Sequence, residues 1–145
     1  MLLSHEAIDV NVADFYGRTA LIEAAECGNL ELVKRLLRMC FIDVNAQALD
    51  GTTPLLIAVK TNHIPLAKEL LMHANIDPNK RDKEGSAPLH IAVEKGFPKI
   101  VELLLKHAKT DVNAENIKAQ TPLICAAVKA RSEITAMLLQ CPKIN

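Results

Sequence analysis

The chain has 145 residues, half of them hydrophobic and 23 % charged, so it can bury a core and is not disordered by composition. Lys plus Arg and Asp plus Glu each number 17, which gives a formal net charge of zero. A neutral chain has no general attraction for nucleic acid or anionic lipid, and this excludes binding through bulk basic charge. The apolar residues are mostly Leu and Ala, with no Trp and a single Tyr, a composition that favours helices over strands.

Signals for export, membranes and metals are absent from the sequence. Glu6 precedes any long apolar run, which argues against a signal peptide, and uncharged runs are far shorter than the ~20 residues of a membrane span. No C-x-x-C pair or zinc-finger spacing occurs among Cys27, Cys40, Cys125 and Cys141. We therefore expect reduced, partly buried, metal-free thiols in an intracellular, cytoplasmic protein. Cys27 should be the most reactive of them, and Cys40, in register with alanines, should pack as a small residue.

The dominant feature of the sequence is a repeat of 34 residues. Five kinds of position recur in one register: Asp9, Asp43, Asp77 and Asp111; Asn11, Asn45, Asn79 and Asn113; Leu21, Leu55, Leu89 and Leu123; Ala24, Ala58, Ala92 and Ala126; Leu36, Leu70, Leu104 and Leu138. This register divides the chain into residues 1–11, which match the tail of a unit, and four units at 12–45, 46–79, 80–113 and 114–145.

Each unit is predicted to form a helix, a tight turn, a second helix and a loop. In the second unit, Thr53 is suited to cap a helix and Pro54 to occupy its first position. Asn62 can end that helix in the left-handed conformation, as Gly28 and Gly96 can in their units. A second amphipathic helix is expected over residues 64–73. A glycine turn precedes each of the first three helix pairs, at Gly17, Gly51 and Gly85.

The segments Gly51-Thr52-Thr53-Pro54-Leu55 and Gly85-Ser86-Ala87-Pro88-Leu89-His90-Ile91-Ala92 resemble the ankyrin-repeat signature, which has a T-P-L-H-x-A core. The resemblance covers essentially the whole chain. It implies an all-α solenoid of helix-turn-helix units with projecting β-turn or hairpin tips, in a single domain over residues 1–145. The chain departs from the family in its 34-residue unit, where 33 is usual. Ala119 and Ala130 stand where other units mostly carry glycine, so the sequence leaves the turn geometry of the last unit open.

No motif for catalysis or cofactor binding is present, and we expect a protein that is not an enzyme and has no cofactor. His5, His73 and His107 share a column with Met39 and Cys141, which suggests either a ladder of metal ligands or histidines at helix ends. The second interpretation is favoured because stacked helices lie too far apart for one zinc ion. His90 occupies the histidine position of the ankyrin signature, so a structural hydrogen bond is expected. That bond is open to rearrangement because Ala87 replaces the usual threonine.

The repeated Asp and Asn residues of the loops are expected to be structural, because their side chains hydrogen-bond nearby backbone and join each loop to the next. The resemblance adds a second possibility, since asparaginyl hydroxylation occurs at this loop position in ankyrin proteins. Its candidate sites are Asn45, Asn79 and Asn113.

The family resemblance implies a protein-binding scaffold or adaptor that uses tips and inner helices. On the tips, the partner-facing positions are Phe15, Tyr16, Arg18, Leu49, Asp50, Thr52, Lys83, Glu84, Ser86, Ile117, Lys118 and Gln120. On the inner helices they are Glu26, Cys27, Lys60, Thr61, Glu94, Lys95, Val128 and Lys129. Apolar tip residues either form a binding site or fold back onto the next tip. We favour binding, with Phe15, Tyr16 and Arg18 as the main anchor.

Other functional classes are weaker. The lysines of the second half are interspersed with acidic residues, which disfavours a nucleic-acid site. Alternatives are a regulatory ankyrin segment of a larger enzyme or channel, a secreted bacterial effector that acts in the host cytosol, and a small-molecule or metal sensor. The leader starts inside an outer helix, and the last unit keeps Ile134, Met137, Leu138 and Leu139. We therefore expect a monomeric fragment of a longer array, without membrane insertion.

Overall fold

The computed structural model describes residues 8–145, which form eight helices in four antiparallel pairs and no strand beyond one isolated bridge between Ala13 and Thr19. The predicted all-α solenoid is confirmed. The first helices of the pairs are α1 (Ala20–Glu26), α3 (Pro54–Lys60), α5 (Pro88–Lys95) and α7 (Pro122–Val128). The second helices are α2 (Leu30–Leu37), α4 (Ile64–Leu71), α6 (Pro98–Lys106) and α8 (Ser132–Leu139).

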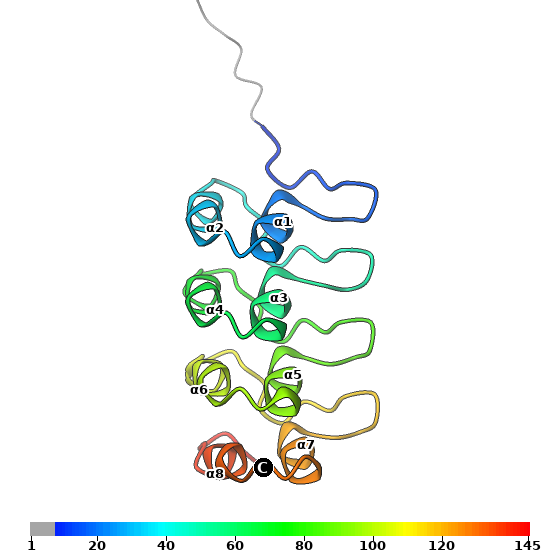
Figure 1. The fold of residues 1–145 in the computed structure, drawn as a ribbon, viewed down its shortest axis with the longest axis vertical. Coiled ribbons are helices and arrows are strands. Elements are labelled where there is room, and N and C mark those ends of the chain that lie inside the picture. Colours follow the sequence, from blue (N-terminus) through cyan, green and yellow to red (C-terminus); the bar gives the residue numbers. More distant parts are fainter. Residues whose placement is uncertain (1–7) are drawn as a thin grey trace, which may run out of the picture.

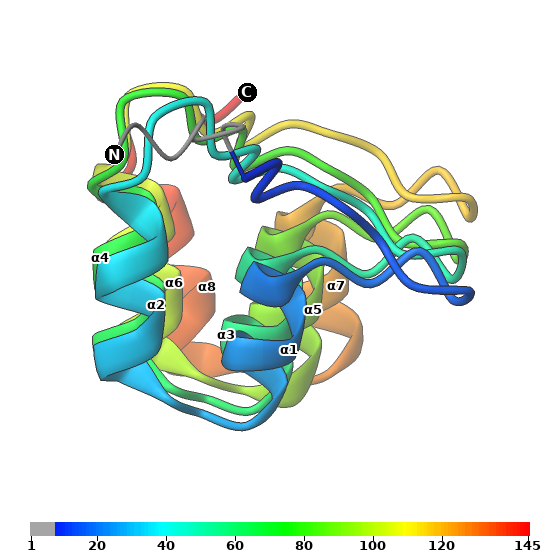
Figure 2. The same cartoon turned by 90° about the horizontal axis from the view of Figure 1, so that it is seen from above.

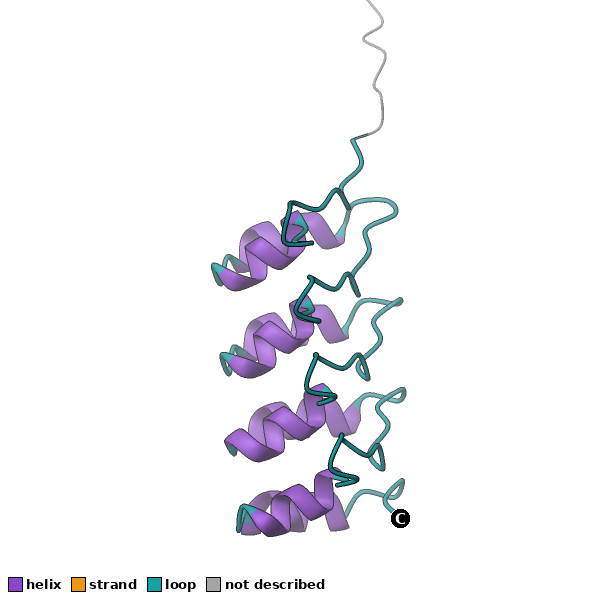
Figure 3. Cartoon of the chain, turned by 90° about the vertical axis from the view of Figure 1, so that its right-hand side faces the viewer, coloured by secondary structure: helices purple, strands orange, loops and turns teal. Residues whose placement is uncertain are grey.

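The helices stack in two layers. Figure 1 shows α1, α3, α5 and α7 in one column and α2, α4, α6 and α8 in the other. Seen from above, the loops before the first helices all project to one side, so that the cross-section is L-shaped (Figure 2). Viewed from that side, they form a row of tips along the stack (Figure 3). The first helices are therefore the inner layer, beside the tips, and the second helices are the outer layer.

The core lies between the layers and between successive units. The repeated alanine of the inner helices is buried in every unit, at Ala24, Ala58, Ala92 and Ala126, which lets neighbouring helices approach closely. On the outer helices, Leu70, Leu104 and Leu138 are fully buried. The expectation for Cys40 is wrong: it is exposed, as are Ala74 and Ala108, because the outer helices end before this position. Cys27 is also exposed, whereas Cys125 and Cys141 are buried and all four thiols are free.

The two ends of the stack differ. Ile57 and Ile91 are buried, but the same position in the first unit holds the exposed Glu23. At the other end, Ile124, Val128 and Leu139 of the last helix pair are exposed at 45 %, 66 % and 60 %. The last helix pair thus exposes three large apolar side chains, whereas the first pair exposes only one, Leu32.

Left-handed backbone turns recur at two positions in every unit, and Phe41 adds one more in the first unit. Gly28, Asn62, Gly96 and Ala130 have φ between 53° and 74° at the turn between the paired helices. The tips use Gly17, Gly51, Gly85 and Ala119, with φ between 56° and 78°. The two alanines of the last unit therefore keep the common geometry, although a residue with a Cβ atom is strained there.

The inner helices begin in the predicted way, with one exception. Thr19, Thr53 and Thr121 each accept a hydrogen bond from the backbone N–H three residues later, and Pro occupies the first position of α3, α5 and α7. Ala87 provides no such cap to α5.

The ring of His90, on α5, is fully buried, and its Nε2 lies 3.1 Å from the carbonyl oxygen of Gln120 in the next unit. Burial lowers the pKa of His90, so the ring is neutral and donates this bond. Its Nδ1 has no hydrogen-bond partner within residues 8–145.

Replacing Ala87 with Thr should raise the free energy of unfolding by about 1 kcal/mol, because a hydroxyl at this position caps the first turn of α5. The hydroxyl also adds a hydrogen-bond donor on the same turn as His90. Urea unfolding followed by circular dichroism measures the change. Ala87→Val, which has the same shape without the hydroxyl, is the matched control and should give no gain.

Ala119→Gly and Ala130→Gly should each stabilise the fold by about 0.5–1 kcal/mol. Glycine removes the ~1–2 kcal/mol cost of a left-handed alanine, and the greater freedom of the unfolded chain offsets part of this gain. Thermal unfolding of each variant checks the prediction. Ala136→Gly, at an exposed right-handed position in α8, should instead destabilise by about 1 kcal/mol. Equal effects at the three positions would contradict the prediction.

Candidate functional site

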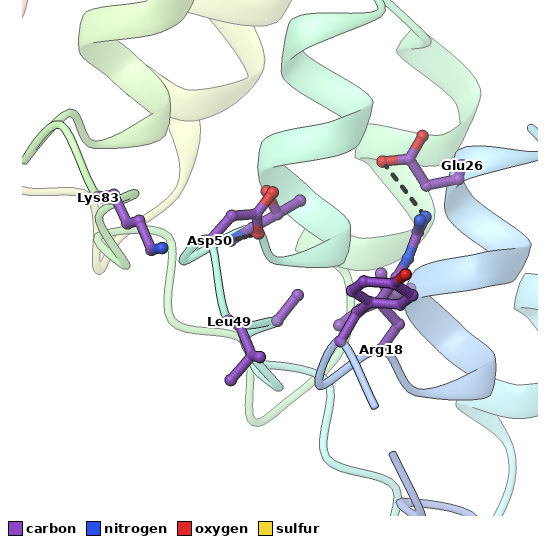
Figure 4. A pocket seen from close by; sticks show the side chains of 9 residues that line it. Arg18, Glu26, Leu49, Asp50 and Lys83 are labelled. Atoms are coloured by element: carbon purple, nitrogen blue, oxygen red, sulfur yellow. Dashed lines mark hydrogen bonds and ion pairs between the residues drawn. The ribbon is translucent and has the colours of Figure 1, made fainter. Parts of the chain in front are cut away.

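A groove of about 350 Å³ lies between the first two tips and the inner helix α1 (Figure 4). Most of the residues that line it are partner-binding positions predicted from the sequence. We call it the tip groove, and its lining consists of Tyr16, Arg18, Ile22, Glu26, Ala48, Leu49, Asp50, Thr52 and Lys83. The fold thus places residues from three successive units around one concave surface.

Backbone hydrogen bonds fix the shape of this surface. At the first tip, the Asp14 carboxylate accepts hydrogen bonds from the N–H groups of Tyr16 and Arg18, both at 2.9 Å. The N–H of Leu49 donates to the carbonyl oxygen of Tyr16, also at 2.9 Å, and joins the second tip to the first. Gly17 is required here, since its φ is 75° and a Cβ atom would lie 3.1 Å from the Leu49 nitrogen. The groove is therefore formed before any partner binds.

The apolar residues of these tips point into solvent instead of folding back. Phe15 is 89 % exposed, Tyr16 65 % and Leu49 66 %. The rings of Phe15 and Tyr16 pack edge to face with centroids 5.6 Å apart, which limits their freedom without burying them. Ile117 on the fourth tip is also exposed, although its side chain leans over Gly85.

Some charged side chains of the tip groove form ion pairs with other residues of the chain, and others do not. The guanidinium of Arg18 is bound by Glu23 at 2.6 Å and lies 3.7 Å from Glu26. Figure 4 shows Asp50 between the Arg18–Glu26 pair and Lys83. None of the ion pairs formed within residues 8–145 includes Asp50 or Lys83. The Thr52 N–H donates to the Asp50 carboxylate at 2.9 Å, and this hydrogen bond lowers the pKa of Asp50.

The structure corrects the expectation that the residue after each tip turn projects toward a partner. Thr52 is buried, and Arg18, Ser86 and Gln120 are only partly exposed. The reason is the backbone: in each tip the carbonyl oxygen of this residue accepts a hydrogen bond from the N–H four residues earlier. The chain has therefore already turned back toward the inner helix.

The remaining predicted residues do not line the tip groove. Lys60 is held by the nearly buried carboxylate of Asp82 at 3.2 Å. Glu94 is partly buried, and its carbonyl oxygen accepts a hydrogen bond from Arg131. The other positions are exposed on inner-helix ends or tips: Cys27, Thr61, Glu84, Lys95, Ile117, Lys118, Val128 and Lys129.

Sequence reasoning missed Ile22 and Ala48, which also line the groove. Ile22 is buried and precedes Glu26 by one helical turn, so helical spacing is the signal that relates the two.

The loop asparagines clamp each unit to the next, as the sequence predicted. The side-chain N–H of Asn79 donates to the carbonyl oxygen of Lys109 at 2.8 Å, and its side-chain oxygen accepts from the Asp111 N–H at 2.8 Å. Asn11, Asn45 and Asn113 make the same two contacts 30 and 32 residues further along. Hydroxylation of Asn45, Asn79 or Asn113 stays a prediction.

The histidine column has a local structural role. Nδ1 of His73 accepts from the Asn75 N–H, and Nδ1 of His107 accepts from the Lys109 N–H. His5 lies outside the described residues. Within residues 8–145, no group of three or more His, Cys, Asp or Glu side chains is arranged to hold a metal ion. In the same range, no helix has the length and apolar character needed to cross a membrane.

Comparison with protein families decides the assignment. The model for ankyrin repeats matches three overlapping segments, residues 1–48, 30–116 and 75–145. The chain belongs to the ankyrin-repeat family. Proteins of this family are generally protein–protein interaction modules and typically non-catalytic. A comparison with curated proteins gives no match.

Asn79→Ala should lower the free energy of unfolding by about 1–3 kcal/mol, because it removes two hydrogen bonds between units. Denaturant unfolding measures the loss. Asn75→Ala is the matched control: its exposed side chain makes none of the hydrogen bonds found within residues 8–145, and a change within about 0.5 kcal/mol is expected. Equal losses in the two variants would show that the asparagine hydrogen bonds between units do not stabilise the stack.

Proposed function

We propose that this ankyrin-repeat protein is a scaffold or adaptor that binds a segment of a partner protein through its tips and inner helices, with the tip groove as the principal contact. The observation that carries the proposal is the position of two exposed apolar side chains, Tyr16 and Leu49, on the rim of a preformed concave surface. Solvent-exposed apolar residues grouped beside a groove are typical of interaction sites.

The construction of the groove suits binding. One hydrogen bond joins its two tips and others hold each tip internally, so little backbone ordering has to accompany complex formation. Tyr16 combines a large apolar area with a hydroxyl at its tip, and tyrosine is enriched among residues that dominate binding energy. Phe15 supports that ring from the side. The remaining exposed tips would add area and specificity along the stack.

Tyr16→Ala should weaken partner binding by about 2 kcal/mol or more and change fold stability by only about 0.5 kcal/mol. The full chain is immobilised and used to select binders from a phage-displayed library of random peptides. The affinity of a selected synthetic peptide is then measured by isothermal titration calorimetry for each variant.

Phe41→Ala is the matched control, because Phe41 is 94 % exposed but lies outside the tip groove. It should bind like the parent chain, as should Lys118→Ala on the fourth tip. If Tyr16→Ala binds normally while Lys60→Ala or Lys95→Ala abolishes binding, the partner occupies the charged ends of the inner helices and the assignment of the tip groove is wrong.

A further inference from the structure

We infer that the segment bound in the tip groove carries a single Lys or Arg next to an apolar anchor, with the cation on Asp50 and the anchor against Tyr16 and Leu49. The inference rests on the proposed function and adds to it the chemistry of the partner. It follows from the way in which the charged groups of the groove are, or are not, already paired.

Arg18 is unavailable to an incoming acidic group. Its Nε lies 2.6 Å from the carboxylate of Glu23, and its Nη2 lies 3.7 Å from Glu26 on the other side. Only part of the Arg18 side chain remains accessible to solvent. A partner carboxylate placed here would meet two carboxylates for one guanidinium. This end of the groove therefore does not favour anions.

Asp50 is available and held in place. One of its carboxylate oxygens accepts the Thr52 N–H at 2.9 Å, which fixes the side chain on the groove wall and lowers the pKa of the group, so it is charged at neutral pH. Lys60, the cation whose field reaches Asp50, is itself bound to Asp82 at 3.2 Å. The Asp50 carboxylate takes part in none of the ion pairs within residues 8–145 and is therefore available to accept from an ammonium or guanidinium group.

Lys83 limits how many cations the groove accepts. It lines the far end, beyond Asp50 in Figure 4, and no ion pair of the described residues neutralises it. A second basic residue of the partner would be repelled there, so a polybasic segment fits poorly. The charge pattern and the apolar rim together favour an extended peptide with one cation beside one apolar residue. They disfavour nucleic acid, whose phosphates would approach Asp50 and Glu26.

The test uses the full chain, a phage-displayed library of random peptides, and selection against the parent, Asp50→Asn and Lys83→Met. The parent should enrich peptides in which one Lys or Arg neighbours an apolar residue. Asp50→Asn keeps an acceptor for the Thr52 N–H, should lose the enrichment of the basic residue, and should bind a parent-selected peptide about tenfold more weakly. Lys83→Met should admit peptides with two or more basic residues.

Asp111→Asn is the matched control: Asp111 is an exposed aspartate that accepts a backbone N–H at 3.0 Å in the same local geometry, far from the groove. It should behave like the parent.

Peptides that bind in a Tyr16-dependent way without a preferred basic residue, or acidic peptides that depend on Lys83, would overturn the inference and leave the proposed function standing. Failure to select any Tyr16-dependent peptide would overturn the proposed function itself. Sedimentation showing self-association that Tyr16→Ala abolishes would identify a second copy of the chain as the occupant and overturn the inference.

Discussion

The contact on which the stack depends is made by one asparagine in each loop. Its side-chain amide donates to a carbonyl group of the following loop and accepts from an N–H two residues later, so each loop is tied to the next at a fixed distance. The preceding aspartate accepts the asparagine's own N–H and holds its backbone in place. Spacing between tips, and therefore the width of any surface that spans two tips, is set by this ladder.

Apolar packing works with the ladder but on another part of each unit. The buried alanines of the inner helices allow close approach, and the leucines of the outer helices fill the space between the layers. His90 replaces an apolar side chain at one unit boundary and keeps a hydrogen bond across it. Because each unit contacts only its neighbours, such local changes alter one boundary and leave the others intact.

The function that we propose depends on the projecting side of the stack, where the tips carry exposed apolar side chains. Figure 2 shows the tips extending away from both helix layers, and several apolar residues at their ends are exposed. Polar side chains could hydrogen-bond water at these positions, whereas Phe15, Tyr16 and Leu49 expose apolar surface to it. Their exposure is a cost that the fold does not require, which is why binding is the function that this surface supports best.

The amino-acid sequence alone determined the helix pairs, the capping threonine of the second unit and the role of the loop asparagines, and its resemblance to ankyrin repeats implied the fold class. All of these depend on contacts that recur from unit to unit. That resemblance also implied most residues of the tip groove as partner-facing positions. The left-handed turns at Ala119 and Ala130 needed the tertiary structure, since alanine by itself disfavours this conformation. The burial of Thr52, the exposure of Cys40 and the ion pair of Lys60 with Asp82 also became known only from the tertiary structure. Each of these depends on the direction of a side chain relative to another unit, and a repeat register specifies positions along the chain without specifying that direction.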